Sequence, residues 1–196
     1  MIKRLLFVTL LAASTPAWSD AHYPGLLVDV KREGSLYTFT ASFDTPLTKC
    51  AAYHYLTDYE AAKNLPGVIE SLAFRQSANK VKVDRTADEH ILFFHVRLHS
   101  VMEYTEKPFD GVEFSQLMGD SKSFKGSWHI ESNAQGSTLS FHGLWEPDTI
   151  LPLFVIDHFA AHGLTDKFTA IAELAEKRKD LLSTQCEAPQ VAKIEK

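Results

Sequence analysis

The strongest constraint on the fold is a run of alternating apolar and polar residues that is followed by one long helical pattern. From residue 69 onward the side chains alternate with the period of two that is typical of strands with one buried face. Six such segments span residues 69–77, 80–87, 90–105, 109–118, 122–132 and 136–146. Short turn sequences separate them, so we expect consecutive segments to pair antiparallel. A single sheet with one apolar face must then be covered by another part of the chain.

The segment before these strands combines one further strand with two short helices. Residues 36–43 alternate apolar and polar side chains, which predicts a half-buried strand. Pro46 suits the first turn of a helix, and residues 47–57 continue a helical pattern. Asp58 is placed to cap a second short helix that ends near Lys63.

The long helical pattern covers residues 153–182, with a kink or break expected at Gly163. Its apolar residues recur at helical spacing, at Leu164, Phe168, Ile171, Ala172 and Ala175. Because no other segment is large enough to cover the sheet, we predict an α+β fold in which this helix covers the apolar face. A seven-stranded antiparallel sheet wraps around a long C-terminal helix, and two short helices follow the first strand. A curved sheet around one helix leaves a space between them.

The first nineteen residues have the three parts of a secretory signal peptide. Lys3 and Arg4 precede an apolar run, and the small residues Ala17 and Ser19 follow it. The run is too short to span a bilayer, although an uncleaved anchor is the alternative. We expect cleavage after Ser19, or else after Ala21.

This assignment divides the chain into a signal peptide at 1–19, a domain at 20–186 and a flexible tail at 187–196. No later segment is long and apolar enough to cross a membrane. We therefore expect a periplasmic or secreted protein without a transmembrane segment after cleavage. Transient contact with a membrane surface stays open.

The charge of the chain argues against nucleic acid as a partner. The net charge is −5, and removal of the signal peptide with Lys3 and Arg4 makes it −7. The basic residues Lys122 and Lys125 and the run 177–179 are interpreted as solvated positions.

Cys50 and Cys186 are the two cysteines, and an even count in an exported protein fits one disulfide. Zinc sites need more ligands at closer spacing, and no C-x-x-C occurs. We expect neither a metal nor a cofactor.

Several short sequences resemble the START-like (Bet v 1-type) superfamily, most closely its polyketide cyclase/dehydrase and coenzyme-Q-binding branch. In order along the chain they are Thr57-Asp58-Tyr59-Glu60, Leu65-Pro66 with Ser71, Val112-Glu113-Phe114, Gly119-Asp120, Gly126-Ser127-Trp128, Gly136-Ser137-Thr138-Leu139 and Ala175-Glu176-Lys177-Arg178. The resemblance runs from about Leu36 to about Leu182. It departs from the family in the export signal and in the two cysteines.

The resemblance implies a helix-grip fold with an apolar tunnel under the long helix. Some relatives bind lipids or quinones, and others are cyclases. In helix-grip relatives the short helices support the C-terminal part of the long helix, which implies that Cys50 and Cys186 can meet.

Aromatic side chains on the inner sheet face and on the long helix are candidates for lining this cavity. They are Phe94, Phe114, Trp128, Phe141, Trp145 and Phe168. Gly126 and Gly143 share the face and are expected to leave volume unfilled. The alternative is an ordinary packed core, because aromatic residues mostly fill cores.

Catalytic and metal-binding patterns are weak. His158 and His162 share a helix face, but two ligands do not make a metal site. The polar residues His95, Arg97, His99, His129 and His142 are interpreted as an exposed outer surface. The chain contains no G-x-S-x-G, P-loop or G-x-G-x-x-G motif.

We therefore assign no catalytic residue and favour a carrier of an apolar small molecule, such as a lipid or a quinone, over an enzyme. A cavity enzyme of the cyclase or dehydratase type and a protein-interaction domain without a ligand are the alternatives.

Overall fold

The computed structural model describes residues 23–91 and 94–187, without the side chains of His90, Ile91 and Phe94. The expected signal peptide at 1–19 lies outside these residues, as does the expected tail at 187–196 except for Glu187, which ends the last helix.

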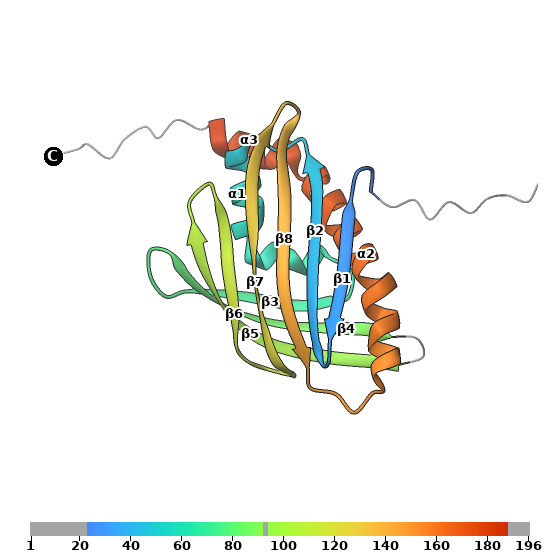
Figure 1. Cartoon of the computed structure of the whole chain (residues 1–196). Helices are drawn as coiled ribbons and strands as arrows, with labels where there is room; N and C mark the ends of the chain where they lie inside the picture. Colours follow the sequence, from blue (N-terminus) through green and yellow to red (C-terminus); the bar gives the residue numbers. More distant parts are fainter. Residues whose placement is uncertain (1–22, 92–93, 188–196) are drawn as a thin grey trace, which may run out of the picture.

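One antiparallel sheet forms most of the domain, in the order β1-β2-β8-β7-β6-β5-β4-β3. Its strands are β1 (Leu27–Glu33), β2 (Leu36–Thr45), β3 (Val68–Arg75), β4 (Lys80–Ile91), β5 (Phe94–Lys107), β6 (Gly111–Gly119), β7 (Ser121–Asn133) and β8 (Gly136–Pro147). In Figure 1, β3, β4 and β5 run almost across the direction of β1, β2 and β8, so the sheet is strongly curved.

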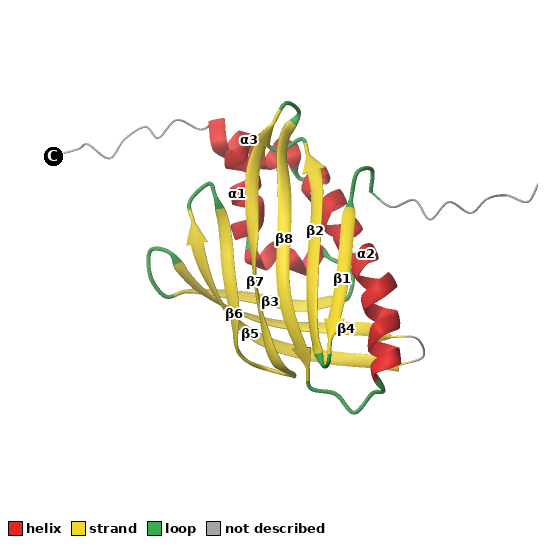
Figure 2. Cartoon of the chain, in the orientation of Figure 1, coloured by secondary structure: helices red, strands yellow, loops and turns green. Residues whose placement is uncertain are grey.

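The helices all lie on the inner side of this curve, as Figure 2 shows. They are α1 (Lys49–Thr57), the 3-10 helix η1 (Tyr59–Asn64), α2 (Leu153–Lys177) and α3 (Lys179–Glu187). The α+β class, the antiparallel sheet and the covering C-terminal helix are as predicted.

The sheet has eight strands among the described residues, so the predicted number of seven is wrong. The missed strand, β1, lies at one edge of the sheet and pairs only with β2. Val28 and Val30 pack against the core, but charged side chains surround them and most of the strand is exposed. Gly34, at φ 63°, supplies the left-handed backbone of the two-residue turn into β2.

The long helix is continuous through Gly163, so the break considered there does not occur. A single glycine only weakens a helix, and here the ring of Phe159 packs over it. The helix ends instead at Lys177, because Arg178 leaves helical geometry at φ −97° and ψ 3°. Leu182, expected at the end of one continuous helix, belongs to α3.

Two neighbouring core clusters fill the space between helices and sheet. The first joins aromatic residues of β2, β6 and β8 to Ile156, Ala160 and Phe168 of α2. The second joins Leu47 and α1 to Ala172 and Ala175 of α2 and Leu182 of α3. The predicted disulfide between Cys50 and Cys186 is confirmed and ties α1 to α3.

Candidate ligand-binding cavity

A cavity of about 110 Å³ lies between the sheet and the C-terminal half of α2. Four strands, both short helices and α2 contribute to its walls. The lining consists of Tyr55, Leu56, Asp58, Tyr59, Ala61, Ala62, Leu65, Arg85, Tyr104, Val112, Trp128, Ile171, Leu174 and Arg178. Most of these side chains are apolar or aromatic, which is typical of small-molecule sites.

Trp128 is one of two lining residues, with Ile171, that pack against both core clusters. Its ring centroid lies 5.0 Å from that of Phe141 and 5.9 Å from that of Phe168. A change in the position of Trp128 would therefore alter the cavity and the core together.

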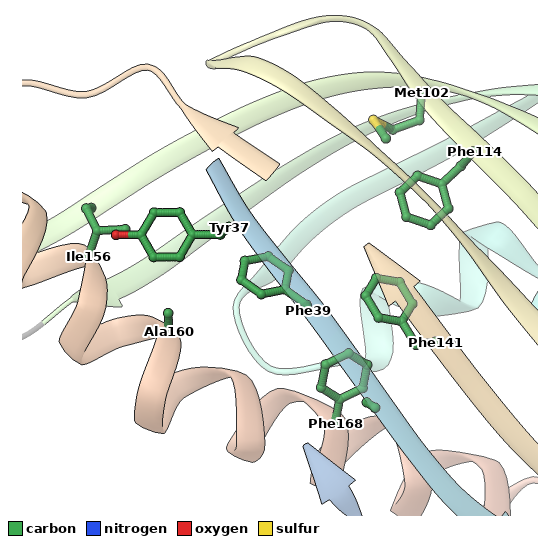
Figure 3. Close-up of a cluster of buried hydrophobic side chains, with 9 residues drawn as sticks. Tyr37, Phe39, Met102, Phe114, Phe141, Ile156, Ala160 and Phe168 are labelled. Atoms are coloured by element: carbon green, nitrogen blue, oxygen red, sulfur yellow. The ribbon is translucent and has the colours of Figure 1, made fainter. Parts of the chain in front are cut away.

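Figure 3 shows the aromatic cluster beside the cavity, with Phe114, Phe141 and Phe168 directed toward one another between α2 and the sheet. The rings of Phe141 and Phe168 lie 5.1 Å apart, and those of Phe114 and Phe141 lie 6.0 Å apart. Trp145 contacts Tyr37 and Phe39 at the far end of the cluster. Of the six predicted lining residues, Trp128 lines this cavity. Four others are not among its lining residues and belong to the first core cluster or pack against it, namely Phe114, Phe141, Trp145 and Phe168. The side chain of Phe94 lies outside the described residues.

Gly126 and Gly143 face each other on β7 and β8, but they do not leave an empty volume as expected. A Cβ on Gly126 would lie 2.7 Å from the ring of Phe114 and 2.3 Å from the backbone oxygen of His142. A Cβ on Gly143 would lie 2.8 Å from the ring of Phe141. The space that these glycines give up is therefore filled by aromatic rings from the same sheet face.

The polar groups of the cavity gather near α1, η1 and the end of α2. Tyr55 donates a hydrogen bond to the backbone oxygen of Ile171 at 2.7 Å, and Tyr59 donates to Glu106 at 3.2 Å. Burial raises the pKa of both tyrosines well above the ordinary value, and for Tyr59 the neighbouring Glu106 adds to the effect. Both hydroxyl groups therefore stay protonated near neutral pH.

Two arginines complete this polar end. Arg178 donates to the carboxylate of Asp58 at 2.5 Å, and Arg85 donates to Ser71 Oγ at 3.3 Å. Arg178 is thus turned inward, which corrects its interpretation as a solvated position. Asp58 precedes η1 but makes no side-chain capping bond there, because its carboxylate binds Arg178.

A larger hollow of about 350 Å³ lies on the outer face of the sheet, over Gly126. It is open, and two of its carboxylates are already paired, Glu103 with Lys80 and Glu113 with Lys107. The inner cavity fits an apolar ligand better, since its walls are mostly apolar.

The outer face also holds predicted polar residues. His99 contacts Asp84 at 2.8 Å, and His129 lies 3.5 Å from Asp110. His142 borders the outer hollow. His95 and Arg97 are exposed on β5. These positions agree with an exposed surface.

Potential metal ligands come together at one place among the residues that the structure describes. Cys50, His54 and Cys186 have ligand atoms within 4.8 Å of one another, but the two sulfur atoms are bonded to each other. His158 and His162 stack on the exposed face of α2. Neither arrangement offers a set of free ligands.

The sequence reasoning missed the polar end of the cavity, at Tyr55, Tyr59, Arg85, Tyr104 and Arg178. One signal was present for Arg85, because it continues the inward alternation of the buried residues Val81 and Val83 along β4.

Comparison with family models and with curated proteins finds no match. Solved structures do match. A STAR-related lipid transfer protein from Xanthomonas axonopodis is 13% identical, with a TM-score of 0.61, over 77% of this chain and 98% of that chain. The Zhui aromatase/cyclase from Streptomyces sp. R1128 is 10% identical, with a TM-score of 0.60, over 73% and 95%.

The di-domain aromatase/cyclase BexL from the BE-7585A biosynthetic pathway is 12% identical, with a TM-score of 0.61. The match covers 76% of this chain and 52% of BexL, so this chain spans about half the length of that relative. These similarities show that the chain has the START-like fold.

Proposed function

We propose that this protein binds an apolar small molecule, such as a lipid or a quinone, between its sheet and α2, and carries it outside the cytoplasm. The observation that carries the proposal is the cavity of about 110 Å³, whose walls are mostly apolar. A fold of this kind supports many activities, so the proposal rests on the cavity rather than on the fold.

A periplasmic or secreted location is supported by two features. The Cys50–Cys186 disulfide is typical of proteins in oxidising compartments. The first nineteen residues of the sequence have the pattern of a signal peptide.

The state of the polar groups favours a carrier over an enzyme. Tyr55 and Tyr59 are engaged in hydrogen bonds and stay protonated, so they are poor general bases at neutral pH. The carboxylate of Asp58 is bound to Arg178. A cyclase or dehydratase acting in the cavity is the second candidate, and similarity to the fold of an aromatase/cyclase favours it.

Transient membrane contact is part of the proposal. Ile150 is fully exposed just before α2, and Leu153 and Phe154 are exposed in its first turn. Val155 and Ile156 in the same turn are buried, so this turn is apolar on both its inner and outer sides. Among the described residues, no helix is long and apolar enough to span a membrane. Contact would therefore be made by these exposed side chains.

Native mass spectrometry of the full-length protein, exported and purified from its own host, tests the proposal. We expect a population whose mass exceeds that of the polypeptide by one apolar molecule, which denaturation releases. A protein that carries no molecule and takes up none when incubated with host lipid extract would overturn the proposal. Conversion of the added molecule into a new product would support the enzyme instead.

A further inference from the structure

Arg178 places a buried, incompletely paired guanidinium group beside the cavity. Its side chain is only 14% exposed, and its Nη2 donates to Asp58. Its Nη1 is buried and has no hydrogen-bond partner among the described residues. Arg178 is also one of the residues that line the cavity.

A buried, unpartnered nitrogen of a charged group is unfavourable, because it has lost water without gaining an acceptor. Native proteins rarely leave such groups unsatisfied, and each case needs a cause such as a water molecule, an ion or a ligand. A negatively charged ligand group in the cavity beside Arg178 would offset part of this cost through the attraction between opposite charges.

Arg85 brings a second positive charge to the same cavity. It lies on β4, and its only hydrogen bond among the described residues is from Nε to Ser71 Oγ. Asp58 is the one carboxylate in the lining, and it is bound to Arg178. The lining therefore has an excess of positive charge, which attracts an anion.

The remaining walls are unsuited to a bare inorganic anion. Trp128, Ile171 and Leu174 form an apolar surface that continues from the arginines. A ligand that satisfies both parts must have a charged head group and an apolar body.

We propose that the ligand is an amphipathic carboxylate, whose head group pairs with the guanidinium groups of Arg85 and Arg178 while its apolar chain lies against Trp128 and Ile171. This inference rests on the proposed function and names the class of ligand. A carboxylate suits the planar donors of a guanidinium group better than an uncharged head group does. The cavity of about 110 Å³ is small, so it holds the head group and the first carbons of the chain.

The test compares decanoate with decan-1-ol, which share a chain length and differ in head-group charge. Each is titrated into the disulfide-bonded full-length protein in competition with an apolar fluorescent probe. We expect decanoate to bind about tenfold or more tightly than the alcohol, since hydrogen bonds to charged groups are stronger than neutral ones.

Four variants locate the head group. Arg178→Gln and Arg85→Gln should each weaken decanoate binding and leave decan-1-ol binding unchanged. Lys179→Gln is the matched control, because it removes the same charge at the next, exposed position. Asp58→Asn removes the one negative charge of the lining, so it should tighten decanoate binding alone, a gain that a merely destabilised protein would not show.

Equal binding of the two compounds to the unmodified protein would overturn this inference and leave the proposed function standing. An equal effect of Arg178→Gln and Lys179→Gln would do the same. Binding of neither compound, nor of the probe, would overturn the proposed function as well.

Discussion

Cys50, near the start of α1, and Cys186, near the end of α3, are joined by a disulfide across 136 residues, with their Cα atoms 6.1 Å apart. The bond closes the chain from α1 to α3 into one loop, with β1 and β2 outside it. It fixes the start of α1 to the end of α3, and the ion pair between Arg178 and Asp58 joins the end of α1 to the start of α3.

Removal of this disulfide should destabilise the protein substantially. Without the bond, the unfolded chain is no longer closed into a loop of this length. On the chain-entropy model, this lowers the free energy of unfolding by about 4–5 kcal/mol. Chemical denaturation of Cys50→Ser/Cys186→Ser beside the oxidised protein measures the difference. A thiol assay on exported, unreduced, unfolded protein should find no free thiol, and two free thiols would contradict the bond.

Gly126→Ala should also destabilise the protein, because the added Cβ meets the backbone oxygen of His142 at 2.3 Å and the ring of Phe114. We expect a loss of about 1–3 kcal/mol from overpacking. Gly163→Ala is the comparison, since it meets only the movable ring of Phe159 and gains helix propensity. Thermal denaturation should separate the two variants, and equal stability would show that the sheet relaxes around the methyl group.

Tyr37 makes the stability of the fold sensitive to alkaline pH. Burial raises the pKa of its hydroxyl, and the hydrogen bond to Asp157 at 2.8 Å adds to this effect. Together they bring the pKa to about 12. The unfolded chain loses this proton near its ordinary pKa of 10.0, before the folded chain does. Stability is therefore fully present below pH 10 and is lost as the pH rises toward 12, by about 2–3 kcal/mol.

Tyr37→Phe removes this titrating group. The free energy of unfolding should then fall less steeply with alkaline pH, by the contribution of one proton. Urea denaturation at a series of alkaline pH values measures the slope. An unchanged slope in the variant would exclude Tyr37 as the source.

The exposed apolar side chains before and within the first turn of α2 should control membrane contact. Replacing Ile150 and Phe154 with serine should lower binding to phosphatidylcholine vesicles by about tenfold or more, because each buried apolar side chain contributes about 1.5–3 kcal/mol. The control replaces Leu117 and Met118, which are exposed on β6, with serine. Vesicle sedimentation that is equal for both double variants would contradict a specific contact.

The alternating pattern from residue 69 onward predicted most of the sheet, because each strand has one buried and one exposed face. The strand β1 was not predicted because its alternation is short: only Val28 and Val30 face the core, and a run of charged residues follows them. The role of Arg178 could not be predicted either. Its partner Asp58 is 120 residues away, and only the folded chain brings them together.

The aromatic residues of the inner face illustrate the same limit at the site. The shared face of Trp128 and Phe141 was predictable from strand periodicity, and the structure places their rings in contact. Whether such rings border a cavity or fill it depends on how the helix packs over them. Periodicity alone does not determine this packing.

The most direct test of the account is to fill the cavity. Ala62 lines it from η1, whereas the next residue, Lys63, is exposed. The affinity of an apolar fluorescent probe is measured for Ala62→Trp, for the matched control Lys63→Trp and for the unmodified protein. The account predicts that Ala62→Trp loses probe binding while remaining folded and that Lys63→Trp binds normally; undiminished binding by folded Ala62→Trp would contradict a ligand site in this cavity.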